Sequence, residues 1–450
     1  MGEPRMATER CPQEWWEWAT WLATGLHGRC RWRLPLLLSG ILFAQGRRTV
    51  ASWLRAAGIS TDFSDYYYFI AAVGRKAKPI ATRLLILLLR HLPTGDRILL
   101  ALDDTPTKRY GPKVQGAGIH HNPTSGPADA KFVYGHIWVT LAWVIRHPLW
   151  NTIALPLRAM LYIRQKDIPK LPKKWKWPFQ TKLELAVRLL EWVAPFVFAA
   201  GKSLWIVTDG FYAKRPVLKF VRLAGMVFVS RLRKDAALYS LPPKAKKGKG
   251  RGPGQPPKYG KKRISLAKRA GQPRGWQTIE CVQYGKAVVK KYKTFLATYH
   301  PAYGTIRVVI VQEEAGPEFF FSTDPQPGVR EILEVFADRA AIEQVFHDVK
   351  EVWGAGQQQV RYLWANIGVW HLNLWMHTLV ELWAWNQPKA RLCDRSASPW
   401  DDPDRRPSHA DRRKALRRMM LRAEYLAIAR RWHLPRSIRA MAQRLAQLAM

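Results

Sequence analysis

The chain has 450 residues, 48% of them apolar and 24% charged, which is ordinary for globular protein and excludes extended disorder or a low-complexity fibre. Lys and Arg number 73 against 33 Asp and Glu, so the net charge is +40. This excess of cations indicates a polyanionic partner, most commonly nucleic acid, with an anionic membrane surface as the alternative.

The cysteines and the apolar runs bear on the compartment. The four cysteines share no metal-ligand spacing, which argues against a disulfide scaffold or a zinc ribbon and fits a reducing compartment. The longest apolar runs, at 36–44 and 84–89, are far shorter than the roughly 20 residues that span a bilayer. Acidic residues precede the first apolar run, unlike in a signal peptide. We therefore expect a cytoplasmic protein with no membrane segment.

Residues 1–95 have the pattern of a basic helical domain. Apolar residues recur at helical spacing over 15–26, 41–57 and 80–91. Such a bundle is a candidate for DNA binding. The competing interpretation is a helical core whose basic residues are simply solvated.

Two acidic positions follow predicted strands in the next segment. The apolar run 98–102 is typical of a buried strand and leads into Asp103 and Asp104, and the run 203–208 leads into Asp209. Because sites in open α/β sheets form at the carboxyl ends of strands, we expect these acids at one edge. Between and after them the pattern predicts a strand hairpin over 132–145 and 152–161, helices over 181–194 and 214–223, and a strand over 226–230.

A basic segment without acidic residues then interrupts the pattern. Twelve of the 31 residues from 244 to 274 are Lys or Arg, with frequent Gly and Pro, which predicts a flexible loop rather than a core. Within it Lys261, Lys262 and Arg263 are candidate phosphate contacts of an electrostatic clamp on DNA; the alternative is a solvated linker. Strands are expected over 276–283, 287–299, 305–312 and 319–324.

The C-terminal third is mainly helical. We expect one helix over 328–352, a Trp-rich helix over 363–385, a polar linker and a basic helical tail over 410–450. In the first of these, Arg339, Glu343 and Lys350 lie on one stripe. Taken alone, such a stripe is often a surface salt-bridge ladder.

The same stripe carries a family resemblance. Arg339-x3-Glu343-x6-Lys350 resembles the signature Tyr-x2-Arg-x3-Glu-x6-Lys of DDE transposases encoded by bacterial insertion sequences, with Phe336 in place of the tyrosine. The resemblance covers about residues 97–385, and the two terminal arms match only in being basic and helical. Five further segments resemble that family's motifs in the same chain order: 103–108, 209–212, 228–235, 322–324 and 354–361.

The resemblance implies an α/β fold with a ribonuclease-H-like mixed sheet, interrupted by a mainly β insertion and flanked by helical arms. The expected divisions are an N-terminal helical domain (1–95), a catalytic domain in two parts (96–239 and 319–386) around the insertion (240–318), and a linker with a basic tail (387–450).

The resemblance also implies a chemistry: metal-dependent DNA cleavage at the ends of a mobile element and strand transfer into target DNA. Asp103, Asp209 and Glu343 would hold two Mg2+ ions, with Mn2+ as a substitute, because hard cations prefer carboxylate oxygens. The first acid stays open between Asp103, which we favour, and Asp104, since adjacent strand residues point to opposite faces. The absence of clustered Cys and His ligands in the sequence argues against zinc.

Arginine and lysine near these acids are candidates for contact with DNA phosphates. Arg339 and Lys350 come from the signature, and Arg231 and Arg233 from the strand exit. The resemblance implies a homodimer on DNA in the bacterial cytoplasm, associated with the nucleoid. Two alternatives remain: a catalytically inactive DNA-binding derivative, and a ribonuclease-H-like nuclease without strand transfer.

Overall fold

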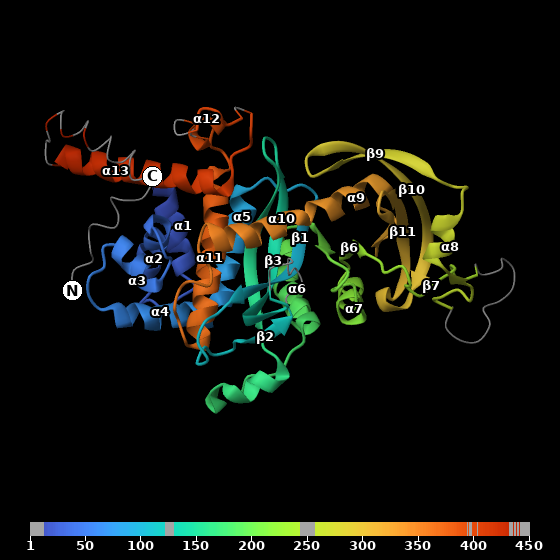
Figure 1. The fold of residues 1–450 in the computed structure, drawn as a ribbon, viewed down its shortest axis with the longest axis horizontal. Helices are drawn as coiled ribbons and strands as arrows, with labels where there is room; N and C mark the ends of the chain where they lie inside the picture. Colours follow the sequence, from blue (N-terminus) through green and yellow to red (C-terminus); the bar gives the residue numbers. More distant parts are fainter. Residues whose placement is uncertain are drawn as a thin grey trace.

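The computed structural model describes residues 13–121, 130–243, 257–393, 395, 398–402 and 404–431, with single positions beyond. The first half of the predicted basic loop, 244–256, lies outside these residues. Along the long axis a bundle of N-terminal helices is followed by a central sheet and then by an extension of that sheet (Figure 1). This arrangement confirms the predicted α/β class with helices at both ends of the chain. None of the helices in the described ranges is long and apolar enough to cross a membrane.

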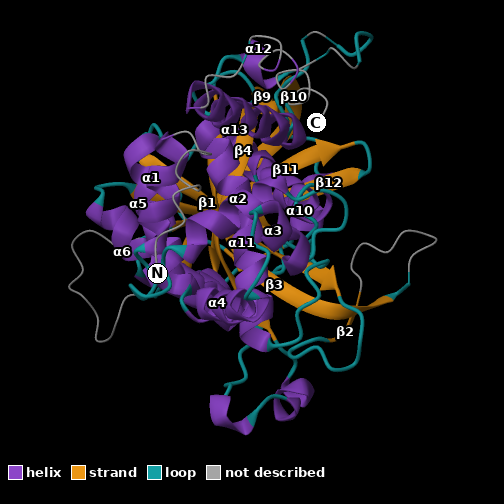
Figure 2. Ribbon diagram, turned by 90° about the vertical axis from the view of Figure 1, so that its left-hand side faces the viewer, coloured by secondary structure: helices purple, strands orange, loops and turns teal. Residues whose placement is uncertain are grey.

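The N-terminal helices lie against the central sheet, in front of its strands in Figure 2. Their buried side chains belong to the same apolar core as those of the sheet. The helices pack around α11 (Leu363–Ala384), in which every residue except Trp364 is buried. The backbones of α4 and α11 touch: a Cβ at Gly74 would lie 1.9 Å from the Trp364 carbonyl oxygen, and one at Gly368 would lie 2.1 Å from that of Ile70. The bundle consists of α1 (Gln13–Ala23), α2 (Arg33–Phe43), α3 (Val50–Ala56), α4 (Phe63–Arg75) and α5 (Ala77–His91).

Five strands form the centre of the sheet in the order β4-β3-β1-β5-β6. β1 pairs antiparallel with β3 and parallel with β5, which in turn is parallel to β6, while β3 and β4 form an antiparallel hairpin. The order and directions are consistent with a ribonuclease-H-like fold. The bounds are β1 (Arg97–Lys108), β3 (Phe132–His147), β4 (Asn151–Tyr162), β5 (Ser203–Thr208) and β6 (Val227–Arg231), and the short β2 (Gly118–His121) pairs with the start of β3.

The later strands extend this sheet rather than forming a separate one. β12 (Gly316–Ser322) pairs antiparallel with β6, and β11 (Gly304–Glu313) and β10 (Lys286–Tyr299) follow it outward. The strands of the basic β-rich segment therefore continue the same hydrogen-bonded ladder (Figure 1). β9 (Gln277–Gln283) and β7 (Leu238–Tyr239) pair with β10, β8 (Arg263–Ile264) pairs with β7, and α8 (Leu266–Gly271) follows β8.

Helices cover both faces of the central strands. α6 (Lys182–Ala199) begins with a capping box in which Thr181 and Glu184 satisfy each other's backbone N–H groups, which fixes its first turn. It packs against β3, β4 and β5, whereas α10 (Ala340–Glu351) packs against β1, β3 and β4. α7 (Arg215–Leu223) lies beside β6, α9 (Val329–Asp338) precedes α10, and α12 (Lys389–Leu392) and α13 (His409–Arg431) follow α11.

Two predicted boundaries are wrong. The first strand does not end before the acids: β1 continues to Lys108 because its antiparallel partner β3 extends beyond the last residue that pairs with β5. The single helix expected over 328–352 is two helices, α9 and α10, joined at Arg339. There the backbone bonds Arg339 N to Phe336 O and Ile342 N to Arg339 O are of the tighter i to i−3 kind, which changes the direction of the chain.

Candidate functional site: three acids from β1, β5 and α10

The register between β1 and β5 brings two of the predicted acids together. Leu102 pairs with Thr208 across the parallel ladder, so the next residues, Asp103 and Asp209, leave that ladder side by side. Asp209 caps its own turn by accepting a hydrogen bond from Phe211 N at 3.1 Å. The two carboxyl groups are close enough to repel each other.

Arg339 joins the first acid to the third. Its Nη1 donates to Asp103 Oδ2 at 3.0 Å, and its Nη2 donates to Glu343 Oε1 at 2.6 Å. The side chains of Arg339 and Asp103 are each 17% exposed, whereas Glu343 is 56% exposed. The Arg339 guanidinium therefore lies between the mostly buried Asp103 and the exposed Glu343. Glu343 is four residues, or about one helical turn, after Arg339.

Burial and mutual repulsion make Asp103 a weak acid. Both effects raise the pKa of Asp103 to about 7, although Arg339 opposes the shift. Burial also raises the pKa of Asp209, again against the effect of Arg339. Ionisation of both carboxyl groups is therefore unfavourable in the protein alone, and a bound cation would make it more favourable.

Asp104 faces other partners than Asp103 does. Its Oδ2 accepts from Lys182 Nζ on α6 at 2.6 Å, and its Oδ1 accepts from the buried Tyr212 hydroxyl at 2.8 Å. Because neighbouring strand residues point to opposite faces, α6 and the α9–α10 junction cover opposite faces of β1. Lys182 and Tyr212 were not expected from the sequence. The only available signal was the place of Tyr212 in the segment that follows Asp209.

Phe336, which stands where the resembling signature has tyrosine, lies close to two guanidinium groups. The Arg231 guanidinium is 5.2 Å and that of Arg339 is 5.7 Å from the ring centroid. Arg231 also donates to both carboxylate oxygens of Glu318 at 2.8 Å. Arg231 therefore lies at the edge of the site and already has an acidic partner.

The other arginine of that strand exit points elsewhere. Arg233 pairs with both oxygens of Asp235 at 3.0 Å, in an exposed position. Lys261, Lys262 and Arg263 are exposed next to β8, which is separated from β5 by β6, β12, β11, β10 and β7. The structure does not bring these four cations to the acids.

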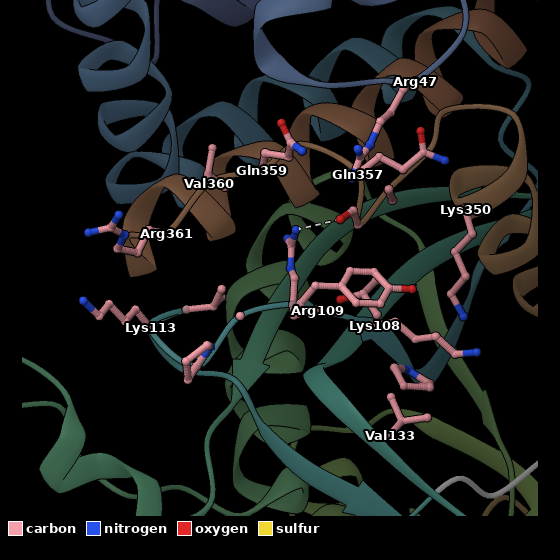
Figure 3. A pocket seen from close by; sticks show the side chains of 18 of the residues that line it. Arg47, Lys108, Arg109, Lys113, Val133, Lys350, Gln357, Gln359, Val360 and Arg361 are labelled. Atoms are coloured by element: carbon pink, nitrogen blue, oxygen red, sulfur yellow. Dashed lines mark hydrogen bonds between the residues drawn. The ribbon is translucent and has the colours of Figure 1, made fainter. Parts of the chain in front are cut away.

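Beyond the acids the end of β1 borders a large basic hollow of about 880 Å3 (Figure 3). Lys350 extends from α10 to the wall of the hollow and donates to Thr105 Oγ1 at 2.7 Å. Burial lowers the pKa of its ammonium group. The buried Arg109 donates to the Gly356 carbonyl at 3.0 Å, which ties the wall after β1 to the loop before α11. The cations that line the hollow are Arg47, Lys108, Arg109, Lys113, Lys350 and Arg361, against one acid, Glu351.

The donors of Asp103, Asp209 and Glu343 suit hard divalent cations, because all are carboxylate oxygens. The repulsion that raises the pKa of Asp103 is what such an ion would relieve. Within the described part of the chain, however, the group of three whose ligand atoms all lie within 4.8 Å of one another is a different one, Asp348, His377 and His409. In the predicted site the Arg339 guanidinium separates Asp103 from Glu343.

The sequence matches a known family over part of its length. Residues 22–288 match the family described as DDE superfamily endonuclease. The matched segment is well over half of the chain and contains Asp103 and Asp209, and it ends before α10 and Glu343. None of the curated proteins matches this sequence. The chain belongs to the DDE superfamily endonucleases.

Proposed function

We propose that the chain is a DNA transposase of the insertion-sequence type, which cleaves DNA at the ends of its mobile element and transfers the strand into target DNA. The observation that carries the proposal is the convergence of acids from β1, β5 and α10 beside a hollow lined by six cations. A general nuclease needs the acids, but a transposase must also hold strands in place between successive steps.

Asp103, Asp209 and Glu343 would hold two Mg2+ ions, with Mn2+ as a substitute. The ions would supply an activated attacking oxygen and neutralise the charge on the leaving one. In cleavage, a water oxygen bonds to phosphorus, the bond to the 3′-oxygen breaks, and a 3′-hydroxyl and a 5′-phosphate result. In transfer, that 3′-hydroxyl attacks a target phosphodiester and displaces the target's own 3′-oxygen.

The cations of the site would hold the backbone of the reacting strand. Arg339 suits a phosphate that replaces the Asp103 carboxylate as its partner, since a planar guanidinium binds both anions in the same way. Lys350 would contact a neighbouring phosphate from the wall of the hollow. Asp104, held by Lys182 and Tyr212, would support the strand end rather than bind metal.

The helices of residues 1–95 and the exposed cations Lys261, Lys262 and Arg263 would contact DNA away from the acids. The divisions at 96–239, 240–318, 319–386 and 387–450 would serve as two catalytic parts, an insertion and a tail. Two chains would act as a homodimer on paired ends, in the bacterial cytoplasm near the nucleoid.

The test is strand cleavage of DNA that carries the element's own ends, with Mg2+ or Mn2+, by the wild type and Glu343→Gln. We expect cleavage at the ends and joining to a target by the wild type. We expect at least a hundredfold loss in the variant, with unchanged binding in a gel-shift assay. Glu191→Gln, an exposed change on α6, is the matched control and should cleave normally.

The outcomes separate the alternatives. Binding without cleavage by the wild type under either metal would support a DNA-binding derivative. Cleavage without preference for the ends and without joining would support a nuclease.

A further inference from the structure

We propose that Asp348, His377 and His409 form a binding site for a transition-metal ion of the zinc class, separate from the three acids. One ligand atom from each residue lies within 4.8 Å of the others, and all three side chains are buried. They come from α10, α11 and the first residue of α13. Two imidazoles and one carboxylate are the donor set that zinc prefers, whereas Mg2+ prefers oxygen alone.

The cluster lies on the other side of α10 from the catalytic stripe. Asp348 is five residues beyond Glu343, which is about 140° around a helix of 3.6 residues per turn. Gln344, one turn before Asp348, donates to Asp348 Oδ1 at 2.9 Å. Oδ2 of Asp348 faces His377 Nε2 at 3.7 Å, beyond hydrogen-bond distance but suitable for two ligands of one ion.

His377 has unused coordinating capacity in the interior. It is 3% exposed, and its Nδ1 has no hydrogen-bond partner. Buried imidazoles normally satisfy their ring nitrogens, because an unpaired polar group in the core costs free energy. The other nitrogen of His377, Nε2, faces Asp348 Oδ2 at 3.7 Å, so an ion bound there would bond to both groups, while Nδ1 stays unpaired.

The hydrogen bonds of His409 fix which nitrogen offers a lone pair. The Trp353 indole can only donate, and it donates to His409 Nε2 at 2.8 Å, so this nitrogen is unprotonated. The proton is then on Nδ1, which contacts Glu381 Oε1 at 2.6 Å. A carboxylate that holds the far N–H of a histidine is the usual way in which proteins orient a metal-ligating imidazole. Binding at Nε2 displaces the Trp353 indole from this nitrogen.

Charge and access also suit a cation. Two buried carboxylates lie beside the histidines, Asp348 next to His377 and Glu381 next to His409, and Nε of the buried Arg412 lies 3.1 Å from Glu381 Oε1. Glu381 Oε2 has no hydrogen-bond partner. A cavity of about 340 Å3 is lined by these three residues together with His377 and His409, which provides a path for a hydrated ion. A bound ion would hold α10, and with it Glu343, against α11 and α13.

The experiment is metal analysis and titration of the full chain after treatment with a chelator. Wild-type protein should bind one Zn2+ per chain, retain it in excess Mg2+, and develop visible absorption with Co2+. Asp348→Asn and His377→Gln should each weaken Zn2+ binding at least a hundredfold. His121→Ala changes an exposed histidine on β2, outside the cluster, and it should bind like the wild type.

The readout does not depend on DNA cleavage. Glu343→Gln should keep its Zn2+ even where cleavage is lost, so failure of the transposase proposal leaves this one intact. Absence of stoichiometric Zn2+ and of the Co2+ absorption in the wild type would overturn the proposal, as would wild-type affinity in Asp348→Asn and His377→Gln. Where a variant fails to fold, X-ray absorption of the wild-type zinc complex decides, and a spectrum without two imidazole ligands would contradict it.

Discussion

Arg339 lies 3.0 Å from Asp103, although 236 residues separate them in the chain. The contact forms because the backbone changes direction at Arg339, where α9 meets α10. The same guanidinium holds Glu343. The positive charge between the acids is thus supplied by the protein itself, and a metal ion bound by these acids would have to compete with it.

Replacement of Arg339 should have opposite effects on metal binding and on cleavage. Arg339→Ala removes the competing charge, so we expect Mn2+ to bind about tenfold more tightly without DNA, a difference of about 1.4 kcal/mol. Cleavage should fall at least tenfold because the phosphate contact is lost. Calorimetric titration and the cleavage assay measure the two effects. Arg330→Ala, an exposed change on α9, is the control, and weaker Mn2+ binding in Arg339→Ala would contradict the expectation.

The raised pKa of Asp103 predicts a pH-dependent loss of stability. With a folded-state pKa of about 7 against an ordinary value of 3.8, folded protein retains a proton that unfolded protein releases between these pH values. The free energy of unfolding therefore falls as pH rises from about 4 to 7. Asp103→Asn carries no such proton. In EDTA, the melting temperature of Asp103→Asn minus that of the wild type should therefore increase as pH rises from about 4 to 7. A difference that does not change with pH would refute the raised pKa of Asp103.

The different partners of Asp103 and Asp104 predict different mutant phenotypes. Asp103→Asn should lose at least a hundredfold in cleavage rate, whereas Asp104→Asn should stay within about tenfold of the wild type. Tyr212→Phe removes a hydrogen bond of a buried hydroxyl and should cost about 1 kcal/mol of stability in urea unfolding. Greater loss of cleavage in Asp104→Asn than in Asp103→Asn would reverse the roles of the two acids.

The basic hollow predicts how DNA affinity depends on salt. The logarithm of the DNA affinity should fall linearly with the logarithm of the salt concentration. Loss of one phosphate contact should make this slope less steep by about one. Lys108→Ala and Arg361→Ala should each do so and weaken binding of all sequences alike. Lys166→Ala, an exposed change outside the hollow, should leave the slope unchanged in fluorescence titrations. A slope that stays constant in all three variants would exclude DNA from the hollow.

Much of the fold followed from local patterns, because apolar runs and helical spacing mark strands and helices directly. The apolar runs before Asp103 and Asp209 predicted two strands with acids at one edge of the sheet, and the parallel register of these strands brings the acids together. The change of direction at Arg339 was not predictable, since residues 328–352 have a continuous helical pattern. Nor was the cluster of Asp348, His377 and His409, whose members lie far apart in sequence and meet only through packing of three helices.

The close approach of Gly74 and Gly368 has a consequence for where DNA is cut. Because α4 and α11 touch through their backbones, the N-terminal helices are packed firmly against the central sheet. If residues 1–95 bind DNA as proposed, the distance between the bound duplex and the acids is constant. The cut then falls a fixed number of base pairs from the bound segment. One base pair inserted between the bound segment and the element's tip should therefore move the cut one base pair inward.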